Sequence, residues 1–358
     1  MSNKRRQAAL ATALAAAACG EPVDIAIQPI KLDKVASAPA PLSVRSGLTL
    51  LRGGAACVID SYWHRVICIE PGGEAVEFGT EGEGPGEFTF PGDVLRGPSG
   101  TVGVVDRRLH RLSLFSGSGE FLASTGGLPD RLSASGREAM DGTVLGWYRR
   151  LDSNGDRPVV QAEIDVATGR VEWARAFPHE AEVVSCSTPL QRTRRLANGD
   201  GSGDLLFLAC YGEVLVWYAD RDAEGPTAIV RSPTYVERYP TAEDVASELR
   251  TLRSAPWAPD EEEIRARPKE WYGARVVDDQ RQFWAVSHWN AGTDVIPPLS
   301  YIDMFRLTDE GPEYALTLQV ADKVLGMDVL GDTLAVLVVR DAGGVVPERR
   351  VDWYDVEW

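Results

Sequence analysis

Short apolar runs separated by glycine-rich and polar turns form the main pattern of the chain. Examples are CVI (57–59), VICI (66–69), VGVV (102–105) and TLAVLVV (333–339). These runs are apolar on both faces, as strands are when other sheets cover both sides of their own sheet. The pattern predicts an all-β protein built from small packed sheets.

Two segments of this pattern repeat. VIDSYWHRVICIEPGGE (58–74) aligns without a gap with VVDRRLHRLSLFSGSGE (104–120), a displacement of 46 residues. The repeated strand-end acid and strand-start base are Asp60 and Arg65, then Asp106 and Arg111. Each acid is placed to pair with its base across the turn and to accept hydrogen bonds from turn amides. A repeat of this period, made of short strands and glycine turns, is typical of propeller blades.

At these positions the chain resembles the NHL-type six-bladed β-propellers. In that family a strand ends in Asp, an Arg opens the next strand, and Gly-x-Gly-Pro-Gly-x-Phe and a Pro follow. The corresponding residues here are Asp60, Arg65, Gly82, Gly84, Pro85, Gly86, Phe88 and Pro91. The resemblance implies that FGTEGEGPGEF (78–88) connects one blade to the next.

The same loop has the glycine content of a phosphate-binding loop, but its chemistry argues against that function. Glu81, Glu83 and Glu87 would repel a phosphate. Pro85 removes one of the backbone amide donors that such a loop uses. We therefore interpret the glycines as turn residues.

The chain length fits six blades. Residues 47–358 without a helical insertion at 233–272 amount to 272 residues, or about 5.9 repeats of 46. Within the insertion, TAEDVASELRTL and APDEEEIRARP have the capping and charge pattern of two short helices. We predict a six-bladed β-propeller of four-stranded antiparallel blades, with this insertion between blades four and five. A strand from residues 41–51 is expected to complete the last sheet and close the ring.

The N-terminus has the features of an export signal. Lys4, Arg5 and Arg6 precede an apolar run at 8–18 that is too short to cross a membrane. The next residue, Cys19, resembles the lipidated cysteine of bacterial lipoproteins, although Leu14 lies five residues before it instead of three. Plain cleavage, which would release a soluble secreted protein, is the alternative.

Lipidation would divide the chain into a signal peptide (1–18), the lipidated Cys with an Ala- and Pro-rich tether (19–45), and the propeller (46–358). The predicted location is the cell envelope. By the usual lipoprotein sorting pattern, Gly20 rather than Asp after the cysteine favours the outer membrane or the periplasmic side. The lipid is the only predicted contact with the membrane.

Charge restricts the partners. The chain has 37 basic and 53 acidic residues, a net charge of −16, and removal of residues 1–18 leaves 34 basic residues and a net charge of −19. A surface this acidic argues against nucleic acid as a partner. We expect a monomer that binds an unidentified protein, peptide or glycan.

Besides Cys19, four cysteines remain, an even number that suits disulfides in an exported protein. Cys57 with Cys68, and Cys186 with Cys210, each lie symmetrically about a turn. Cross-strand neighbours in a hairpin have this placement, so both pairs are disulfide candidates. The alternative is that they are small buried hydrophobic residues.

Loops and insertions gather on one face of the predicted ring, where blade connections and the turns between second and third strands lie. Such a face often binds ligands. The inner strands that start there carry Arg137, Arg194, Arg275 and Lys323 against one carboxylate, Asp93. These cations would select an anion, unless they pair with strand-end acids or solvent. Further candidate ligand-binding residues are His288 and Trp289 in the loop at 288–298, and Trp257 and Trp271 beside the insertion.

Two functions from different classes fit this pattern. The first is a binding or scaffold propeller that holds an anionic, peptide or glycan ligand or a protein partner at the face with the insertion. The alternative is a metal-dependent hydrolase or lyase that resembles the propeller lactonases, which would use Ca²⁺. The histidines at 64, 110, 179 and 288 assemble no metal-ligand set, so we predict no metal, cofactor or catalytic residue.

The lipid anchor is testable in cells. Radiolabelled palmitate is expected to enter the protein, and Cys19→Ala is expected to lose both the label and the membrane association, because stable anchoring needs the acyl chains. Retention of the Cys19→Ala variant in the membrane fraction would contradict the anchor.

Overall fold

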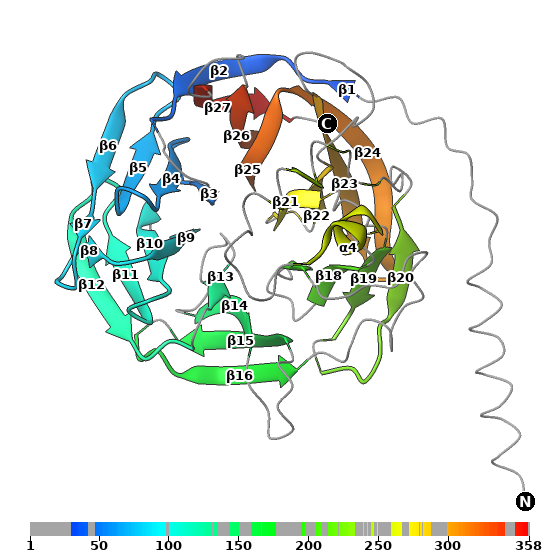
Figure 1. The fold of residues 1–358 in the computed structure, drawn as a ribbon, viewed down its shortest axis with the longest axis horizontal. Helices are drawn as coiled ribbons and strands as arrows, with labels where there is room; N and C mark the ends of the chain where they lie inside the picture. The colour runs from blue at the N-terminus through cyan, green and yellow to red at the C-terminus, as the bar shows by residue number, and fades with distance from the viewer. Residues whose placement is uncertain are drawn as a thin grey trace, which may run out of the picture.

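The computed structural model describes residues 30–41, 47–97, 100–129, 299–340 and 348–356 without a gap, and residues 132–287 in segments that hold the elements named below. Figure 1 shows small sheets arranged in a ring around a common axis. This is the predicted all-β propeller. None of the described helices is long and apolar enough to cross a membrane.

Five sheets of the ring have the predicted four strands. Blade one consists of β3 (Leu48–Leu50), β4 (Ala56–Asp60), β5 (Arg65–Ile69) and β6 (Ala75–Phe78). Blade two consists of β9 (Pro91–Arg96), β10 (Val102–Asp106), β11 (Arg111–Phe115) and β12 (Phe121–Gly126). Blade three consists of β13 (Ser133–Ala134), β14 (Thr143–Arg149), β15 (Val159–Asp165) and β16 (Val171–Ala176). Blade four consists of β17 (Arg195–Ala197), β18 (Leu205–Ala209), β19 (Val214–Tyr218) and β20 (Ala228–Arg231).

Blade six, the last four-stranded sheet, consists of β25 (Lys323–Leu330), β26 (Thr333–Arg340), β27 (Glu348–Asp355) and β2 (Lys34–Pro39). The sheet between blades four and six, blade five, departs from the prediction because it has a fifth strand. Its four antiparallel strands are β21 (Tyr272–Val277), β22 (Gln282–Ser287), β23 (Leu299–Thr308) and β24 (Gly311–Ala321). β1 (Ile30–Lys31) then pairs in parallel with β24.

The N-terminal strand β2 closes the ring by pairing antiparallel with β27. We expected the closing strand at 41–51, but β3 within that range is the inner strand of blade one. The sheets therefore begin before residue 46, inside the range predicted as a tether. The KVASAP sequence of β2 gives little hydrophobic signal, since Ala38 is its one fully buried residue.

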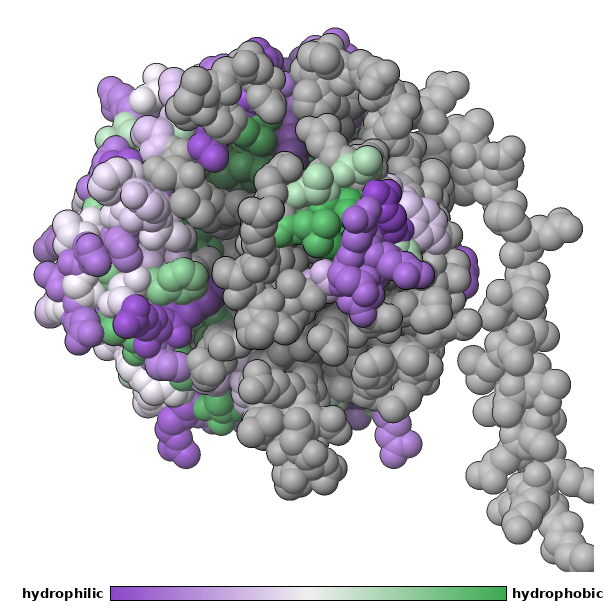
Figure 2. Space-filling view, in the orientation of Figure 1, coloured by the Kyte–Doolittle hydropathy of each residue, from purple (hydrophilic) through white to green (hydrophobic). Residues whose placement is uncertain are grey.

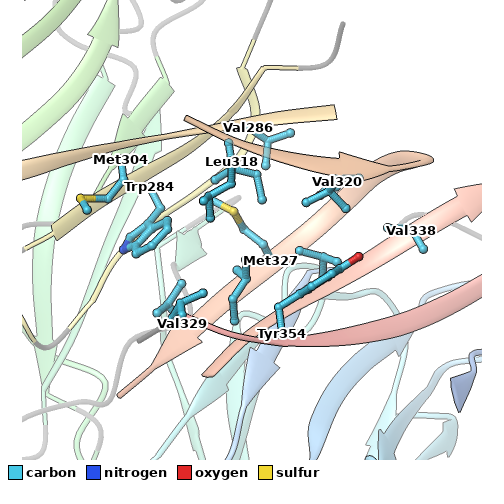
Figure 3. Packing of buried hydrophobic residues seen from close by; sticks show 14 residues of the cluster. Trp284, Val286, Met304, Leu318, Val320, Met327, Val329, Val338 and Tyr354 are labelled. Carbon is cyan, nitrogen blue, oxygen red and sulfur yellow. The ribbon is translucent and has the colours of Figure 1, made fainter. Parts of the chain in front are cut away.

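Adjacent blades bury their apolar faces against each other. Figure 3 shows Trp284 and Met304 of blade five and Met327 and Tyr354 of blade six pointing into one shared layer. Trp217 and Trp353 are also buried. Large apolar side chains that are out of water on both faces of a sheet supply most of the favourable free energy of such a fold.

The repeated acid Asp106 organises the connection between blades one and two. One of its carboxylate oxygens accepts hydrogen bonds from the amides of Arg108 and Leu109, and the other accepts from Thr89 and Phe90. Arg111 does not pair with Asp106 but donates to the backbone oxygens of the 78–88 loop. In the first repeat the predicted pair is present, with Arg65 Nη2 3.7 Å from Asp60 Oδ2.

Contacts between its own residues hold the 78–88 loop in shape. β7 (Thr80–Glu81) pairs in parallel with β8 (Glu87–Phe88), and Phe88 is fully buried. The Glu87 carboxylate accepts a hydrogen bond from the Gly84 amide at 2.7 Å. A Cβ on Gly82, whose φ is +152°, would lie 2.1 Å from that carboxylate. The glycines are thus required for the turn, and a protein carboxylate already takes the amide that a phosphate would need.

Three inner strands near the ring closure share a buried ion pair. Arg96 of β9 lies 3.4 Å from Asp328 of β25, and Arg96 also donates to the Leu50 oxygen of β3. Asp328 accepts hydrogen bonds from the Leu50 amide and the Thr49 hydroxyl. Burial raises the pKa of Asp328 to about 6, although the Arg96 charge opposes this.

The first structural prediction concerns the Cys57–Cys68 disulfide, which links paired positions of β4 and β5. Mass spectrometry of unreduced peptides is expected to find this link in protein from an oxidising compartment. The cysteines are only 11 positions apart in the sequence, so reduction should cost the low end of about 2 to 4 kcal/mol of unfolding free energy. Two free thiols in such material would contradict the link. Cys186 and Cys210 lie outside the described residues.

The second concerns Asp328. Its folded-state pKa is raised, so the native state holds this proton more tightly than the unfolded chain does. This tighter binding adds up to about 3 kcal/mol to the free energy of unfolding below about pH 4. The added stability is lost as the pH rises through 6. In the Asp328→Asn variant the side chain keeps the shape of Asp but has no group that titrates. Urea unfolding from pH 4 to 7 should therefore show wild type losing stability relative to Asp328→Asn, and parallel pH profiles would contradict the raised pKa.

Candidate functional site

The structure describes two of the predicted ligand-binding residues. Lys323 opens β25 and is exposed, and Arg275 lies on β21. β21 and β25 are the inner strands of blades five and six and lie side by side. The remaining predicted site residues lie outside the described residues: Cys19, Arg137, Arg194, Trp257, Trp271, His288 and Trp289.

Of the helical insertion, the structure describes α4 (Glu261–Ala266), with Glu261 to Glu263 in its first turn and Arg265 in its last, as the helix dipole favours. Because α4 belongs to the connection from β20 to β21, it marks the face of blade connections, and Figure 1 looks onto that face. Figure 2 shows a hydrophilic patch at the position of α4, next to hydrophobic residues. We call this side the connection face.

A buried carboxylate precedes Lys323 and binds two guanidinium groups. Asp322 is inaccessible to solvent, and Arg340 donates to it through Nε and Nη2, both at 3.1 Å. Arg350 also donates to Asp322. Burial raises the pKa of Asp322, but the hydrogen bonds from the two arginines outweigh burial and hold it below its usual value. Asp322 thus remains ionised over the physiological range.

The cluster continues outward through blade six. Arg350 Nε donates to Asp352 at 2.9 Å, and Asp352 also accepts from Lys34 Nζ at 2.8 Å and Ser37 Oγ at 2.6 Å. Lys34 and Ser37 belong to the closing strand β2. The charged groups at the start of β25 are therefore fixed by the same contacts that close the ring.

The backbone at Asp322 has a φ of +71°, in the left-handed region that Asp tolerates better than most residues. The Ser300 hydroxyl donates to the backbone oxygen of Asp322 and accepts from the Val324 amide. Ser300 lies on β23, so blade five holds the backbone bend at Asp322 in place. The outcome is a rigid start of β25 from which Lys323 reaches solvent.

The accessible groups at this end include the basic Arg340 and Lys323, and the exposed Glu348 lies opposite Arg340 in the β26–β27 register. The side chain of Arg340 is 46 % exposed, and within the described residues its hydrogen bonds use Nε and Nη2, so Nη1 can donate to a ligand. Lys323 lies opposite Val339 in the β25–β26 register, one residue before Arg340. At the other side of the ring, Asp93 is compensated, because Arg107 Nη2 lies 3.1 and 2.9 Å from its two oxygens.

The sequence did not reveal the roles of Asp322, Arg340, Arg350 and Asp352. Asp322 directly precedes β25, Arg340 ends β26, and Arg350 and Asp352 lie on β27, so their proximity depends on a register that spacing alone does not give. The available signal was Asp352 within the strand sequence ERRVDWYD, where a carboxylate between buried residues requires a partner. Among the residues that the structure describes, no three His, Cys, Asp or Glu side chains are grouped to hold a metal ion.

No protein-family model and no curated protein matches the chain. Among solved structures, a member of the DUF4221 family from Bacteroides vulgatus is 11 % identical, with a TM-score of 0.52 over 90 % of this chain and 97 % of that one. A putative gluconolactonase is 14 % identical, with a TM-score of 0.46 over 92 % and 94 %. A streptogramin B lyase is 12 % identical, with a TM-score of 0.42 over 88 % and 95 %.

At such identities the likeness shows the fold alone, and the first structure carries it because its TM-score exceeds 0.5. The neighbouring structures are propellers. The chain therefore has a β-propeller fold, while its resemblance to the NHL type remains a prediction.

Proposed function

We propose that the protein is an envelope-anchored binding propeller that takes an anionic group of its ligand at the connection-face end of blades five and six. The ligand is an anion itself or a peptide, glycan or protein partner that carries one. The observation that carries this proposal is the half-exposed Arg340 guanidinium, held by buried Asp322 beside exposed Lys323.

The fixed orientation of the Arg340 guanidinium supports an anion as the ligand. A guanidinium whose orientation is fixed by a buried carboxylate loses little conformational freedom when it binds, which favours affinity. Three cations, Arg340, Arg350 and Lys34, pair with the two carboxylates of Asp322 and Asp352, so these ion pairs carry one excess positive charge.

The difference in charge between this basic site and the acidic remainder of the surface supports selectivity among anionic ligands. The whole chain has a net charge of −16, so a basic spot attracts anions locally while the remaining surface repels them. Ligands that carry one anionic group on an otherwise neutral or basic body would suffer least from this repulsion. Charge alone therefore favours such ligands over polyanions.

The test uses inorganic phosphate as the probe and thermal unfolding of the mature domain as the readout, at constant ionic strength against chloride. Phosphate is expected to raise the melting temperature of the wild type, because binding to the native state adds RT ln(1 + [L]/Kd). Lys323→Glu and Arg340→Gln should lose most of the shift. Arg170→Glu is the matched control, since Arg170 is exposed between β15 and β16, on the opposite face.

Equal phosphate shifts in Lys323→Glu and wild type, or no shift in either, would contradict the anion site. Metal analysis of the same preparation addresses the enzymatic alternative. Stoichiometric Ca²⁺ or Zn²⁺ would favour the lactonase-like hydrolase or lyase.

A further inference from the structure

A second surface on the connection face is aromatic. Tyr62, Trp63 and Phe90 are 62 %, 58 % and 50 % exposed, and we call them the aromatic platform. Tyr62 and Trp63 lie in the turn between β4 and β5, and Phe90 directly precedes β9. The Ser61 hydroxyl donates to the Pro91 oxygen at 2.9 Å, which holds the two segments together.

The backbone under the aromatic platform is rigid. Asp60 accepts a hydrogen bond from the Trp63 amide, and Asp106 accepts one from the Phe90 amide at 3.1 Å. Both carboxylates are fully buried. The Phe90 oxygen in turn accepts from the Arg107 amide. Exposed aromatic rings on a fixed backbone cost little entropy to engage, so the platform is preorganised for contact.

The rings present more than one plane. The Tyr62 and Trp63 centroids are 5.1 Å apart and their planes are nearly perpendicular, at 88°. The edge of one ring therefore meets the face of the other, and the remaining faces are open to solvent. Such faces bind apolar C–H groups of a ligand by dispersion and burial.

Charges around the aromatic platform are largely compensated. Arg107 is bound to Asp93 through two donors, and its side chain covers Gly92, where a Cβ would lie 2.3 Å from Nε. Arg65 pairs with Glu77. The exposed charges nearby in the chain have both signs: Arg108, Glu81 and Glu83. A charged ligand thus gains little here, whereas the fixed Arg107–Asp93 pair offers donors and acceptors to hydroxyl groups.

The exposed area of the aromatic platform favours a small ligand over a protein partner. Three aromatic side chains at these exposures present roughly 300 to 400 Å². A stable protein interface needs about 800 Å² from each partner. The aromatic platform alone is too small for that, but it matches a few saccharide rings, each of which has an apolar C–H face and a hydroxyl edge.

We propose that the aromatic platform binds a neutral oligosaccharide, with pyranose rings stacked on Trp63 and its neighbours and hydroxyl groups bonded to the Arg107–Asp93 pair. This site involves blades one and two and is separate from the anion site at Lys323. Its failure would leave the proposed function untouched.

The experiment is calorimetric titration of the mature domain with cellotetraose, maltotetraose and chitotetraose. At least one tetrasaccharide is expected to bind, with the same Kd at 50 and 500 mM NaCl because the ligand is neutral (about 14 and 4 Å Debye lengths). Trp63→Ala should weaken binding by about tenfold or more, and Trp63→Ala with Phe90→Ala should abolish it. These side chains are exposed, so circular dichroism and the melting temperature should not change.

Two controls make the outcome specific. Leu122→Ala removes an apolar side chain of matched exposure, 50 %, from the outer strand β12 and should bind like wild type, as should Lys323→Glu. The proposal is overturned if no tetrasaccharide binds or if Trp63→Ala binds like wild type. Binding of tetralysine in place of every sugar, lost at high salt, would identify a cationic peptide site instead.

Discussion

Pairing between β2 and β27 is the contact on which the ring depends. Blade six takes three strands from the C-terminal end of the chain and the fourth from residues 34–39. Without β2, blade six would lack its outer strand, and the backbone groups of β27 that now pair with β2 would have no partner in the sheet. Lys34 and Ser37 add charged and polar bonds to Asp352, inside the sheet. Closure thus fixes both the ring and the electrostatics of blade six.

Buried aspartates connect this scaffold to its surfaces. Asp60 and Asp106 accept amides from the turns that carry the aromatic platform, and Asp322 orients Arg340. A buried carboxylate is costly unless it is hydrogen-bonded or paired, so each of these residues strongly favours one local arrangement. The exposed side chains next to these aspartates are therefore held on a fixed backbone or in a fixed orientation.

Much of the fold could be predicted from residues that act locally. The 46-residue repeat marked strand ends at Asp60 and Asp106, and the equivalent His64 and His110 indeed share a left-handed backbone, with φ of 52° and 49°. Glycine turns and two-sided apolar strands also report on local structure. The closing strand could not be placed, because an Ala- and Pro-rich segment becomes a strand only through its partner β27.

The site was less predictable for the same reason. Lys323 and Arg275 could be assigned to inner strands from pattern, but the Asp322 network needs the register of three strands. Tyr62 and Trp63 lie in the turn about which Cys57 and Cys68 are symmetric, whereas the placement of that turn beside the segment of Phe90 depends on one long-range bond between Ser61 and Pro91. Sequence patterns report which residues share a strand or a turn, and contacts between blades come only with the closed ring.

Two surfaces with opposite electrostatic character follow from this construction. At blade six, Arg340, Arg350 and Lys34 pair with two carboxylates, so the proposed anion site relies on one excess positive charge, whose effect weakens with salt. At blades one and two, Arg107 is matched by Asp93, so contact relies on aromatic faces and is insensitive to salt. Because each surface rests on its own buried aspartates, one can change without disturbing the other. The two proposed sites therefore lie on one face, where we expect them to take the sugar and the anionic group of a single ligand, or two different ligands.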